Sequence, residues 1–579
     1  MLVFFRFVIK ISPQKKKKKN EQQPNTRAMT SFGDSYSYDG RTKSLFSSGN
    51  VLGQSMFEVF LLTLFVLESV GVRCSSSSSS SNRGEECEEE EESTVVTNEK
   101  DIVDADDDDD DDDASLSSLS LETRWRDFRY VLFPAIACLF HPRASAACGL
   151  CLCARRLVME KNEKKKKKKS RKTSPRRDDD DDDNNNNNNN KNTSWLNLYR
   201  STMLLSACSA ILAIDFSQMP RRLGKTKEYG VSVMDVGVGS FIVSASCVKW
   251  QRRRKNRRSG RNSDGGKRGT EGEEEEARKK TTRAMKRAMV SFLLGFARYV
   301  SVKRSGYQLV EEEYGPMWNF FFSLAVIDIL SAAIILACGN FAFTNEKTRM
   351  RHTFIVASSV AILVEVLLRG NASKNTTMKL ESWLLAPTKD RGEFPTKYTD
   401  IVAFVKLNRE GAFSCVGMTS LHFFGRFFGE YVHRKKCEGE LRRAAWLALA
   451  LWVAAYTSIE VFEIIKPSRR LCNFGYILWM ITYNVSAMVV MAFIHEQYDT
   501  VPSILERANE SPMLVFLFAN VTTGLFNFIL KDEIMRVHTF LAYALMSWHM
   551  ELIHMCINVL ARMKKTRHVK KKKKKTKTN

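Results

Sequence analysis

The sequence predicts an all-α, polytopic integral membrane protein with about 12–13 transmembrane helices joined by disordered, low-complexity loops and tails. Two observations lead to this fold class. Homopolymer runs of lysine, serine, aspartate and asparagine cannot bury apolar surface and are expected to stay disordered. From Trp195 onward, by contrast, the chain consists mostly of apolar stretches of about twenty residues, the length that a helix needs to cross a hydrocarbon core. This composition excludes a soluble enzyme.

The predicted spans can be read directly from the hydropathy of the chain. Phe57 to Val72 is a first candidate, and 129–153 holds either one span or a tight pair broken at His141-Pro142-Arg143. The amino-terminal region is therefore predicted to contain two or three membrane spans. Ten clear spans follow, at 195–215, 230–250, 286–302, 317–338, 352–369, 410–432, 444–465, 472–495, 511–530 and 538–562.

These spans divide the chain into membrane regions and polar segments. The polar segments are a disordered tail at 1–42, a low-complexity insertion at 74–122, a disordered loop at 154–194, a low-complexity loop at 251–282 and a basic tail at 563–579. The membrane regions are the amino-terminal helices within 43–153 and the main transmembrane domain at 195–562. We expect the chemistry to lie in the main domain.

Charge and cysteine content indicate topology rather than a ligand. The net charge is +24, but the lysines and arginines lie in polar runs and in loops beside apolar segments, which does not indicate nucleic-acid binding. The 13 cysteines are scattered, many within apolar segments, and do not form a disulfide framework.

Basic loops set the expected orientation, because an excess of Lys and Arg marks the cytoplasmic side of short loops. Segments 154–177 and 251–288 bracket two spans, which puts the turn 216–229 on the luminal side. Continued alternation places 433–443 and the carboxyl terminus in the cytoplasm. It sends 370–409, with its two glycosylation sequons, to the lumen.

Three charged residues stand out because an ionisable group at membrane depth is costly unless it is paired or faces water. Asp215 ends one span, Lys225 follows ten residues later, and Asp235 lies inside the next span. For Asp215 and Lys225, which flank one short turn, we favour a functional role. For Asp235, a structural ion pair is an equally good interpretation.

The turn also carries Arg221 and Arg222 on the predicted luminal side, against the topological bias. Paired arginines suit a phosphate through forked hydrogen bonds, so a phospholipid headgroup is a natural ligand. The alternative is that these side chains only extend to the membrane interface.

Other polar residues fall on the same predicted side. Each alone is consistent with helix capping or interfacial anchoring, but their shared position predicts one wet cavity at that face. The residues are Asn319 after Trp318, Asn408 and Arg409 before Glu410, Arg469 and Arg470 before Asn473, and Asn527 after Gly524.

Several other motifs give little or no support for a metal site or for other classes of enzyme. Cys148, Cys151 and Cys153 lack a partner pair at zinc-finger spacing, so we expect no metal. His549, Glu551 and His554 are not in the order of a zincin helix and are interpreted as packing residues. The sequence has no Gly-x-Ser-x-Gly elbow and no P-loop, which argues against a serine hydrolase and NTP-driven transport.

The segment AILAIDFSQMPRRLGKTKEYGVSVMDVGVGSFIVS (210–244) resembles the signature of the Gwt1 and PIG-W family, the inositol acyltransferases of glycosylphosphatidylinositol (GPI) anchor synthesis. Further similar segments follow in order at 311–325, 407–418, 468–484 and 514–528, and fainter ones precede at 43–59 and 123–140. The resemblance is collinear from about residue 43 to 562. Leu223-Gly224 departs from the Phe-Ala usual in the family.

The resemblance implies transfer of a fatty acyl group, typically palmitoyl, from acyl-CoA to the inositol 2-hydroxyl of glucosaminyl-phosphatidylinositol in the endoplasmic reticulum membrane. It implies that Asp215 and Lys225 form a catalytic pair, with Asp215 as general base. Arg221 and Arg222 are then expected to hold the lipid phosphate, and Asn319, Asn408 and Arg409 to line the cavity, with Asp235 in a supporting role. The expected partners are acyl-CoA, the glycolipid and membrane lipids, with no cofactor and no nucleic acid.

Two other functions remain open. A polytopic transporter or lipid scramblase also places charges at membrane depth, although the sequence shows no inverted repeat. A membrane-bound O-acyltransferase of the other large family needs a histidine within an apolar helix, and His422 is a candidate, although a packing role is the simpler interpretation.

Overall fold

A computed structural model describes residues 56–86, 121–170, 187–261, 270–305, 314–338, 346–370, 380–386, 401–433, 439–497 and 501–576. Within these ranges the chain forms helices and no β-strand, which confirms the all-α class. The sequons at 371–377, which we expected in the lumen, the tail 1–42 and the runs of aspartate lie outside the described residues.

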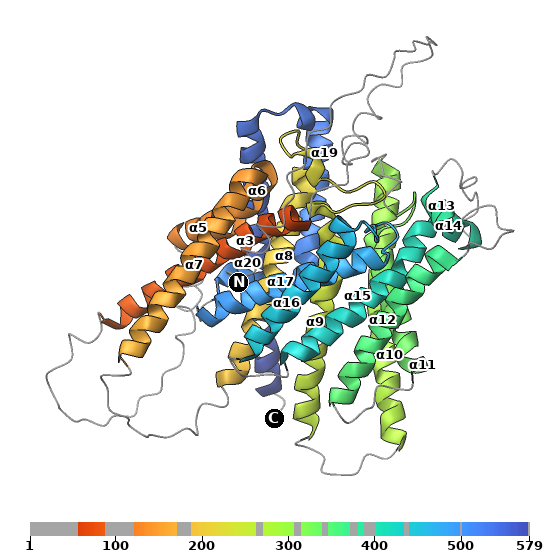
Figure 1. The fold of residues 1–579 in the computed structure, drawn as a ribbon, viewed down its shortest axis with the longest axis horizontal. Coiled ribbons are helices and arrows are strands. Elements are labelled where there is room, and N and C mark those ends of the chain that lie inside the picture. Colours follow the sequence, from red (N-terminus) through yellow and green to blue (C-terminus); the bar gives the residue numbers. More distant parts are fainter. Residues whose placement is uncertain are drawn as a thin grey trace, which may run out of the picture.

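The amino-terminal region forms a helical group of its own (Figure 1). Helix α3 (Met56–Glu86) packs against α7 (Pro142–Ser170). Between them in sequence come α5 (Leu121–Asp127), the π-helical turn η1 (Phe128–Leu132) and α6 (Phe133–Phe140). The chain breaks at His141, where Pro142 cannot continue the preceding helix. Within 129–153 the structure shows two helices separated at His141, and neither is among the described helices that are long and apolar enough to cross a membrane.

The main domain contributes the remaining helices of the bundle. In order they are α8 (Asn187–Ala213), the 3-10 turn η3 (Arg221–Leu223), α9 (Val233–Arg261), α10 (Thr270–Ser305), α11 (Phe320–Ala337), α12 (Glu346–Gly370), α13 (Leu380–Leu385), α14 (Ile401–Leu407), α15 (Arg409–His433), α16 (Gly439–Tyr456) with η5 (Thr457–Val461), α17 (Phe474–Gln497), α18 (Ser503–Glu510), α19 (Pro512–Leu530), η6 (Lys531–Arg536) and α20 (Thr539–Thr576). A helix lies at each of the ten predicted spans.

Six of the described helices are long and apolar enough to cross a membrane. The other predicted spans are also helical, but their apolar stretches are shorter or interrupted by polar residues; Val233–Cys247 of α9 is one such shorter stretch. The six are Phe320–Ala337, Lys347–Arg369, Leu441–Val461, Phe474–Gln497, Pro512–Leu530 and Thr539–Arg567. The chain is therefore a polytopic membrane protein.

Helix α17 forms the centre of the bundle, whereas α10, α12, α19 and α20 expose large apolar side chains on their outer surfaces. Such a surface suits lipid, because hydrocarbon tails solvate apolar side chains. Helices α9 and α15 approach most closely where α15 carries glycine. A Cβ atom on Gly425 would lie 2.6 Å from the Val243 carbonyl oxygen, so only glycine allows this packing.

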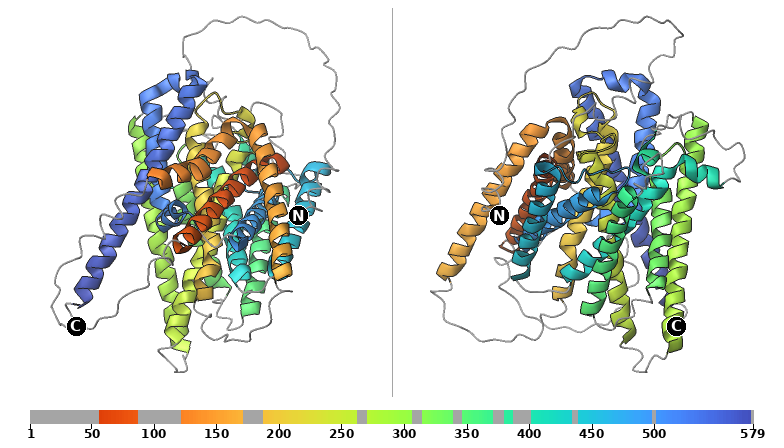
Figure 2. Two further views of the ribbon diagram at one scale, coloured as in Figure 1. Left: turned by 90° about the vertical axis from the view of Figure 1, so that its left-hand side faces the viewer. Right: turned by 45° about the vertical axis from the view of Figure 1, so that its right-hand side comes forward.

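The edges of several low-complexity segments are helical, whereas we expected these segments to be disordered loops. The helical backbone of α3, α7, α8, α9, α10 and α20 extends into the serine, lysine, asparagine and basic runs. Adding a residue to an existing helix avoids the cost of nucleation, which explains why a packed helix continues past its apolar part. The last turns of α20 extend beyond the neighbouring helices (Figure 2).

The predicted polar clusters do meet at one end of the bundle, which we call the polar end. Helices α8 and α19 end there, and α9, α11, α15 and α17 begin there (Figure 1). The ends of α9 and α15 that precede the basic loops lie at the opposite end, as the alternation of the spans requires.

Candidate active site at the polar end

Asp215 lies in the turn that follows α8. Its backbone N–H donates to the Leu212 carbonyl at 3.1 Å, so the turn continues directly from the helix. The Asn527 side chain, in the last turns of α19, donates from Nδ2 to Asp215 Oδ2 at 2.7 Å. Both side chains are buried, with 6% and 4% of their surface exposed. A buried carboxylate is therefore fixed between the ends of two helices at the polar end.

Arg221 holds the backbone on both sides of Asp215. Its Nη1 donates to the Ile214 carbonyl at 2.7 Å and its Nη2 to the Phe216 carbonyl at 3.1 Å. Burial lowers the pKa of Arg221, while the negative charge of Asp215 acts in the opposite direction. Two of its donors are thus used within the loop, so the phosphate-binding role expected for Arg221 has no support in this geometry.

Arg222 points to the other side of the turn. It forms an ion pair with Glu58 of α3 at 3.1 Å, and the two side chains are about one-third exposed. Together with Arg143 at the start of α7 they line an open cleft of about 470 Å³. This cleft presents two guanidinium groups and the Glu58 carboxylate beside the loop that carries Asp215, and the anion-binding role expected for Arg222 stays a prediction.

Lys225 is half-buried and lies two residues after the turn η3. The next residue, Thr226, anchors the loop to α9: its backbone N–H and its hydroxyl donate to Asp235 Oδ2 at 3.2 and 2.8 Å. The segment with Lys225 is therefore fixed at the polar end between Asp215 and Asp235.

Asp235 occupies a buried ion pair rather than an open position. Arg469 Nε donates to Asp235 Oδ1 at 2.8 Å, and the side chains are 2% and 1% exposed. Ser232 adds a hydroxyl donor to Oδ2 at 2.9 Å, and Tyr476 donates to the Asp235 carbonyl at 2.7 Å. With these partners, Asp235 links the loop, α9 and α17. This geometry favours the structural alternative for Asp235 over substrate binding.

A second buried ion pair fixes the same loop from the neighbouring side. Arg470 donates from Nε to Glu410 Oε2 at 3.1 Å and from Nη1 to the Lys227 carbonyl at 3.1 Å. Gly230, whose φ of +125° suits glycine, donates its N–H to the Pro467 carbonyl at 2.8 Å. The segment before α17 therefore holds the part of the loop that precedes α9, at Lys227 and Gly230.

Asn319 and Asn408 satisfy backbone groups. Asn319 accepts from the N–H groups of Phe321 and Phe322 as the N-cap of α11, and its Nδ2 donates to the Gly295 carbonyl at 2.9 Å. Asn408 accepts from the Met317 N–H at 2.9 Å and donates to the Phe404 carbonyl at 2.7 Å. The capping alternative therefore fits both residues better than a cavity lining.

Arg409 is also buried, at 6% exposure, and its guanidinium stacks 4.5 Å from the centre of the Trp383 ring. This cation–π contact attaches α13 to the start of α15. Arg409 thus belongs to the group of arginines that hold the polar end together.

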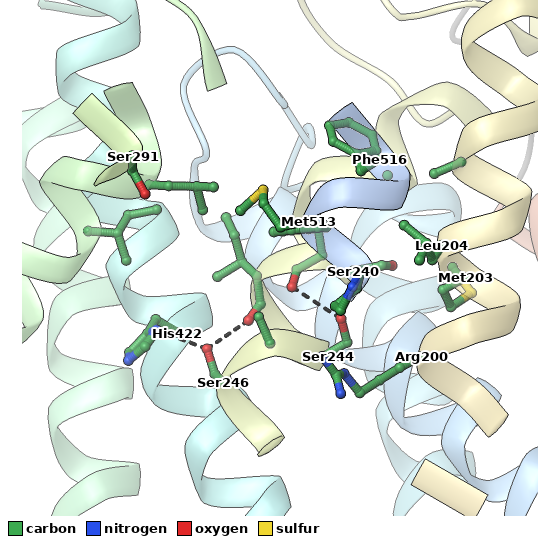
Figure 3. Close-up of a pocket in the computed structure, with 18 of the residues that line it drawn as sticks. Arg200, Met203, Leu204, Ser240, Ser244, Ser246, Ser291, His422, Met513 and Phe516 are labelled. Atoms are coloured by element: carbon green, nitrogen blue, oxygen red, sulfur yellow. Dashed lines mark hydrogen bonds between the residues drawn. The ribbon is translucent and has the colours of Figure 1, made fainter. Parts of the chain in front are cut away.

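An apolar cavity of about 470 Å³ lies deeper in the bundle, between α8, α9, α10, α11, α15 and α19. Figure 3 shows Met513 and Phe516 of α19 between the α10 wall, with Ser291, and the α8 wall, with Met203 and Leu204. On α9 the lining is made mostly of small residues, together with Phe241 and Ile242, and a Cβ atom on Gly237 would meet nothing within 4 Å.

Basic side chains belong to the same cavity lining. Arg200, Lys286 and Arg287 come from α8 and α10, and Arg287 lies 3.4 Å from Asp328 of α11. His422 also lines the cavity, and its Nδ1 is 2.8 Å from the Ser246 hydroxyl (Figure 3). The cavity therefore combines a long apolar wall with a cationic part.

Metal ligation has no candidate among the described residues, which contain no group of three or more His, Cys, Asp or Glu side chains that could hold an ion. Cys148 and Cys151 are exposed on α7, and Cys153 is buried. His549 is buried between α8, α19 and α20, where it contacts Thr522 and the Cys208 carbonyl, in agreement with a packing role.

These features define a polytopic α-helical membrane protein with a buried carboxylate and cation cluster at one end and an apolar cavity within the bundle. The chain belongs to the GWT1 family, whose family model matches residues 41–560.

Individual relatives agree with this assignment. The chain is 30% identical over 339 residues to GPI-anchored wall transfer protein 1 of Kluyveromyces lactis, covering 58% of this chain and 66% of the relative. It is 28% identical over 365 residues to the protein of the same name in Gibberella zeae, covering 58% and 66%. It is 29% identical over 336 residues to an uncharacterized protein of Arabidopsis thaliana, covering 57% and 65%. The chain thus spans just under two thirds of the length of the curated relatives it matches.

Proposed function

We propose that this protein transfers a fatty acyl group from acyl-CoA to the inositol 2-hydroxyl of glucosaminyl-phosphatidylinositol, as a step of GPI-anchor biosynthesis. Membership of the GWT1 family and the names of its relatives, GPI-anchored wall transfer protein 1, support a role in this process. The observation that carries the reaction is the buried carboxylate of Asp215, held at the polar end of a bundle that also contains an apolar cavity.

The apolar cavity within the bundle is suited to bind acyl-CoA, the proposed acyl donor. Ligand pockets of about 300–1,000 Å³ with mostly apolar walls bury most of a hydrophobic ligand, and an acyl chain needs such a wall. Arg200, Lys286 and Arg287 supply positive charge to the same lining, which suits the phosphates of CoA. Ala207, in the cavity wall, lies six residues, or about 9 Å of helix, before the end of α8 at Ala213, and Asp215 follows in the next turn. In the proposed reaction the thioester reaches the polar end along this helix.

The transfer requires removal of a proton from the attacking hydroxyl and stabilisation of the charge that develops on the thioester oxygen. In the proposed reaction Asp215 accepts the hydroxyl proton while the inositol oxygen forms a bond to the thioester carbon. The C–S bond then breaks, and CoA leaves as a thiolate that takes up a proton. Lys225 orients Asp215 or stabilises the developing negative charge. Transfer is direct, without an acyl-enzyme.

The acceptor approaches from the side of the cleft between α3, α7 and the loop. Arg222, together with Arg143, faces this cleft and suits the phosphodiester of the glycolipid. Arg222 follows Arg221 directly, and Arg221 holds the backbone around Asp215. In the proposed binding mode, a phosphate in the cleft brings the sugar to the loop that carries Asp215. We place the reaction in the endoplasmic reticulum membrane, with the polar end luminal and the carboxyl terminus cytoplasmic.

Purified protein in liposomes tests this function against the transporter or scramblase alternative. Supplied with glucosaminyl-phosphatidylinositol and palmitoyl-CoA, the wild type is expected to yield a product heavier by one palmitoyl group, detected by mass spectrometry. A fluorescent phospholipid in the same liposomes reports movement between leaflets. Scrambling without acylated product would replace the enzymatic function by lipid transport.

The His422-dependent acyltransferase is a second mechanism that one observation favours, because His422 pairs with Ser246 within the donor cavity. Trapping a covalent acyl group on Ser246, or on a cysteine such as Cys247 or Cys415, would overturn direct transfer. We favour Asp215 over His422 as the catalytic base because Lys225 and the cleft proposed for the acceptor lie at the polar end with Asp215.

A further inference from the structure

Among the buried carboxylates near the polar end, Asp215 and Asp235 have different hydrogen-bond donors. Asp235 has a guanidinium partner at 2.8 Å and three donors from Thr226 and Ser232. The Asp215 carboxylate receives the uncharged amide of Asn527 at 2.7 Å. A hydrogen bond from an amide donor fixes the direction in which the carboxylate oxygens point.

We propose that Asn527 is a positioning residue that holds the Asp215 carboxylate in the orientation needed for proton abstraction. This role rests on the proposed function of Asp215. Arg221 fixes the backbone at Ile214 and Phe216, and Asn527 fixes the side chain. A general base must lie within hydrogen-bond reach of the proton it abstracts, so both constraints contribute to the geometry of the reaction.

Asn527 is itself held in place by helix packing. His549 of α20 contacts the Thr522 hydroxyl of α19 at 3.2 Å and the Cys208 carbonyl of α8 at 3.3 Å. This contact ties α8, which leads to Asp215, to α19, which carries Asn527. The amide donor and the carboxylate acceptor are therefore supplied by two helices with a fixed relative position, as preorganisation of a catalytic group requires.

The test uses a substitution that keeps volume but removes the donor. Asn527→Leu is expected to lower kcat for acyl transfer by on the order of tenfold or more, with little change in KM for either substrate, because the defect lies in the orientation of the base. Asn527→Gln retains an amide and is expected to recover part of kcat. Asn520 provides the matched control: it lies on the same helix, and its Nδ2 bonds to the Phe516 carbonyl of its own helix.

The kinetics of these variants and of the wild type decide whether Asn527 positions the base. Loss of kcat in Asn527→Leu, partial recovery in Asn527→Gln and wild-type kcat in Asn520→Leu support the positioning role. An equal loss in Asn520→Leu would indicate general damage to α19 and overturn it, as would an Asn527→Leu enzyme with normal kcat. A raised KM with unchanged kcat would make Asn527 a substrate contact instead. Absence of transfer by the wild type would overturn the proposed function, and the positioning role with it.

Discussion

Arg469 donates to the carboxylate of Asp235 at 2.8 Å, and the two side chains are nearly inaccessible to solvent. The pair joins the segment before α17 to the start of α9, 234 residues apart in sequence. Removing one partner of a buried ion pair leaves an uncompensated charge, which typically costs about 3–5 kcal/mol.

We therefore predict that Asp235→Asn and Arg469→Gln each destabilise the protein strongly. The measurement is the thermal unfolding midpoint in detergent, read with intrinsic fluorescence. The double variant removes both charges and is expected to be more stable than the sum of the single changes predicts. Additive effects would show that the two residues do not interact.

Asn319 provides a test of the distinction between capping and catalysis. Because its side chain caps α11 and bonds to Gly295, Asn319→Ala is expected to cost about 0.5–2 kcal/mol of stability. Its kcat and KM for acyl transfer should remain near wild type at a temperature where the variant is folded. A large change in KM without loss of stability would show that Asn319 contacts the substrate.

The adjacent arginines are expected to differ in kinetics. Arg221→Gln loses the clamp on the backbone around Asp215 and should lower kcat. Arg222→Gln loses a cation in the cleft and should raise KM for the glycolipid, with a smaller effect on kcat. Steady-state kinetics at varied glycolipid concentration distinguish the two. Identical kinetic defects in both variants would contradict the separate roles.

Gly237 offers a way to narrow the donor cavity without a clash, since a Cβ atom there would meet nothing within 4 Å. We predict that Gly237→Phe shifts donor preference from palmitoyl-CoA toward shorter acyl-CoA species, whereas Gly237→Ala changes it little. Competition between acyl-CoA chain lengths, with products resolved by mass, measures the shift. An unchanged preference in Gly237→Phe would place the acyl chain elsewhere.

The sequence predicted much of this architecture because span length, charge bias and polar residues at span ends are local signals. The gathering of these residues at one end follows from the alternation of spans, so it could be expected before any contact was known. The side-chain contacts between these residues could not be predicted in the same way. Arg469 and Arg470 were recognised as polar, but their pairing with Asp235 and Glu410 depends on how distant helices pack.

The same limit explains the residues whose roles differ from expectation. The sequence presents Arg221 and Arg222 as an equivalent pair, yet the turn directs one toward the loop backbone and the other toward Glu58 of α3. Asn527 was visible as a polar residue near the end of an apolar span, but its contact with Asp215 joins positions 312 residues apart. Side-chain direction in a tight turn and long-range contacts are tertiary properties.

The most direct test of the central claim is acyl transfer by variants of the proposed catalytic pair. Microsomes that lack the endogenous activity, supplied with glucosaminyl-phosphatidylinositol and palmitoyl-CoA, are expected to form product with the wild type. Asp215→Asn and Lys225→Met, checked for wild-type thermal stability, should abolish it, while His422→Ala retains measurable turnover. Product formation by a folded Asp215→Asn variant, or its loss only in His422→Ala, would contradict the account.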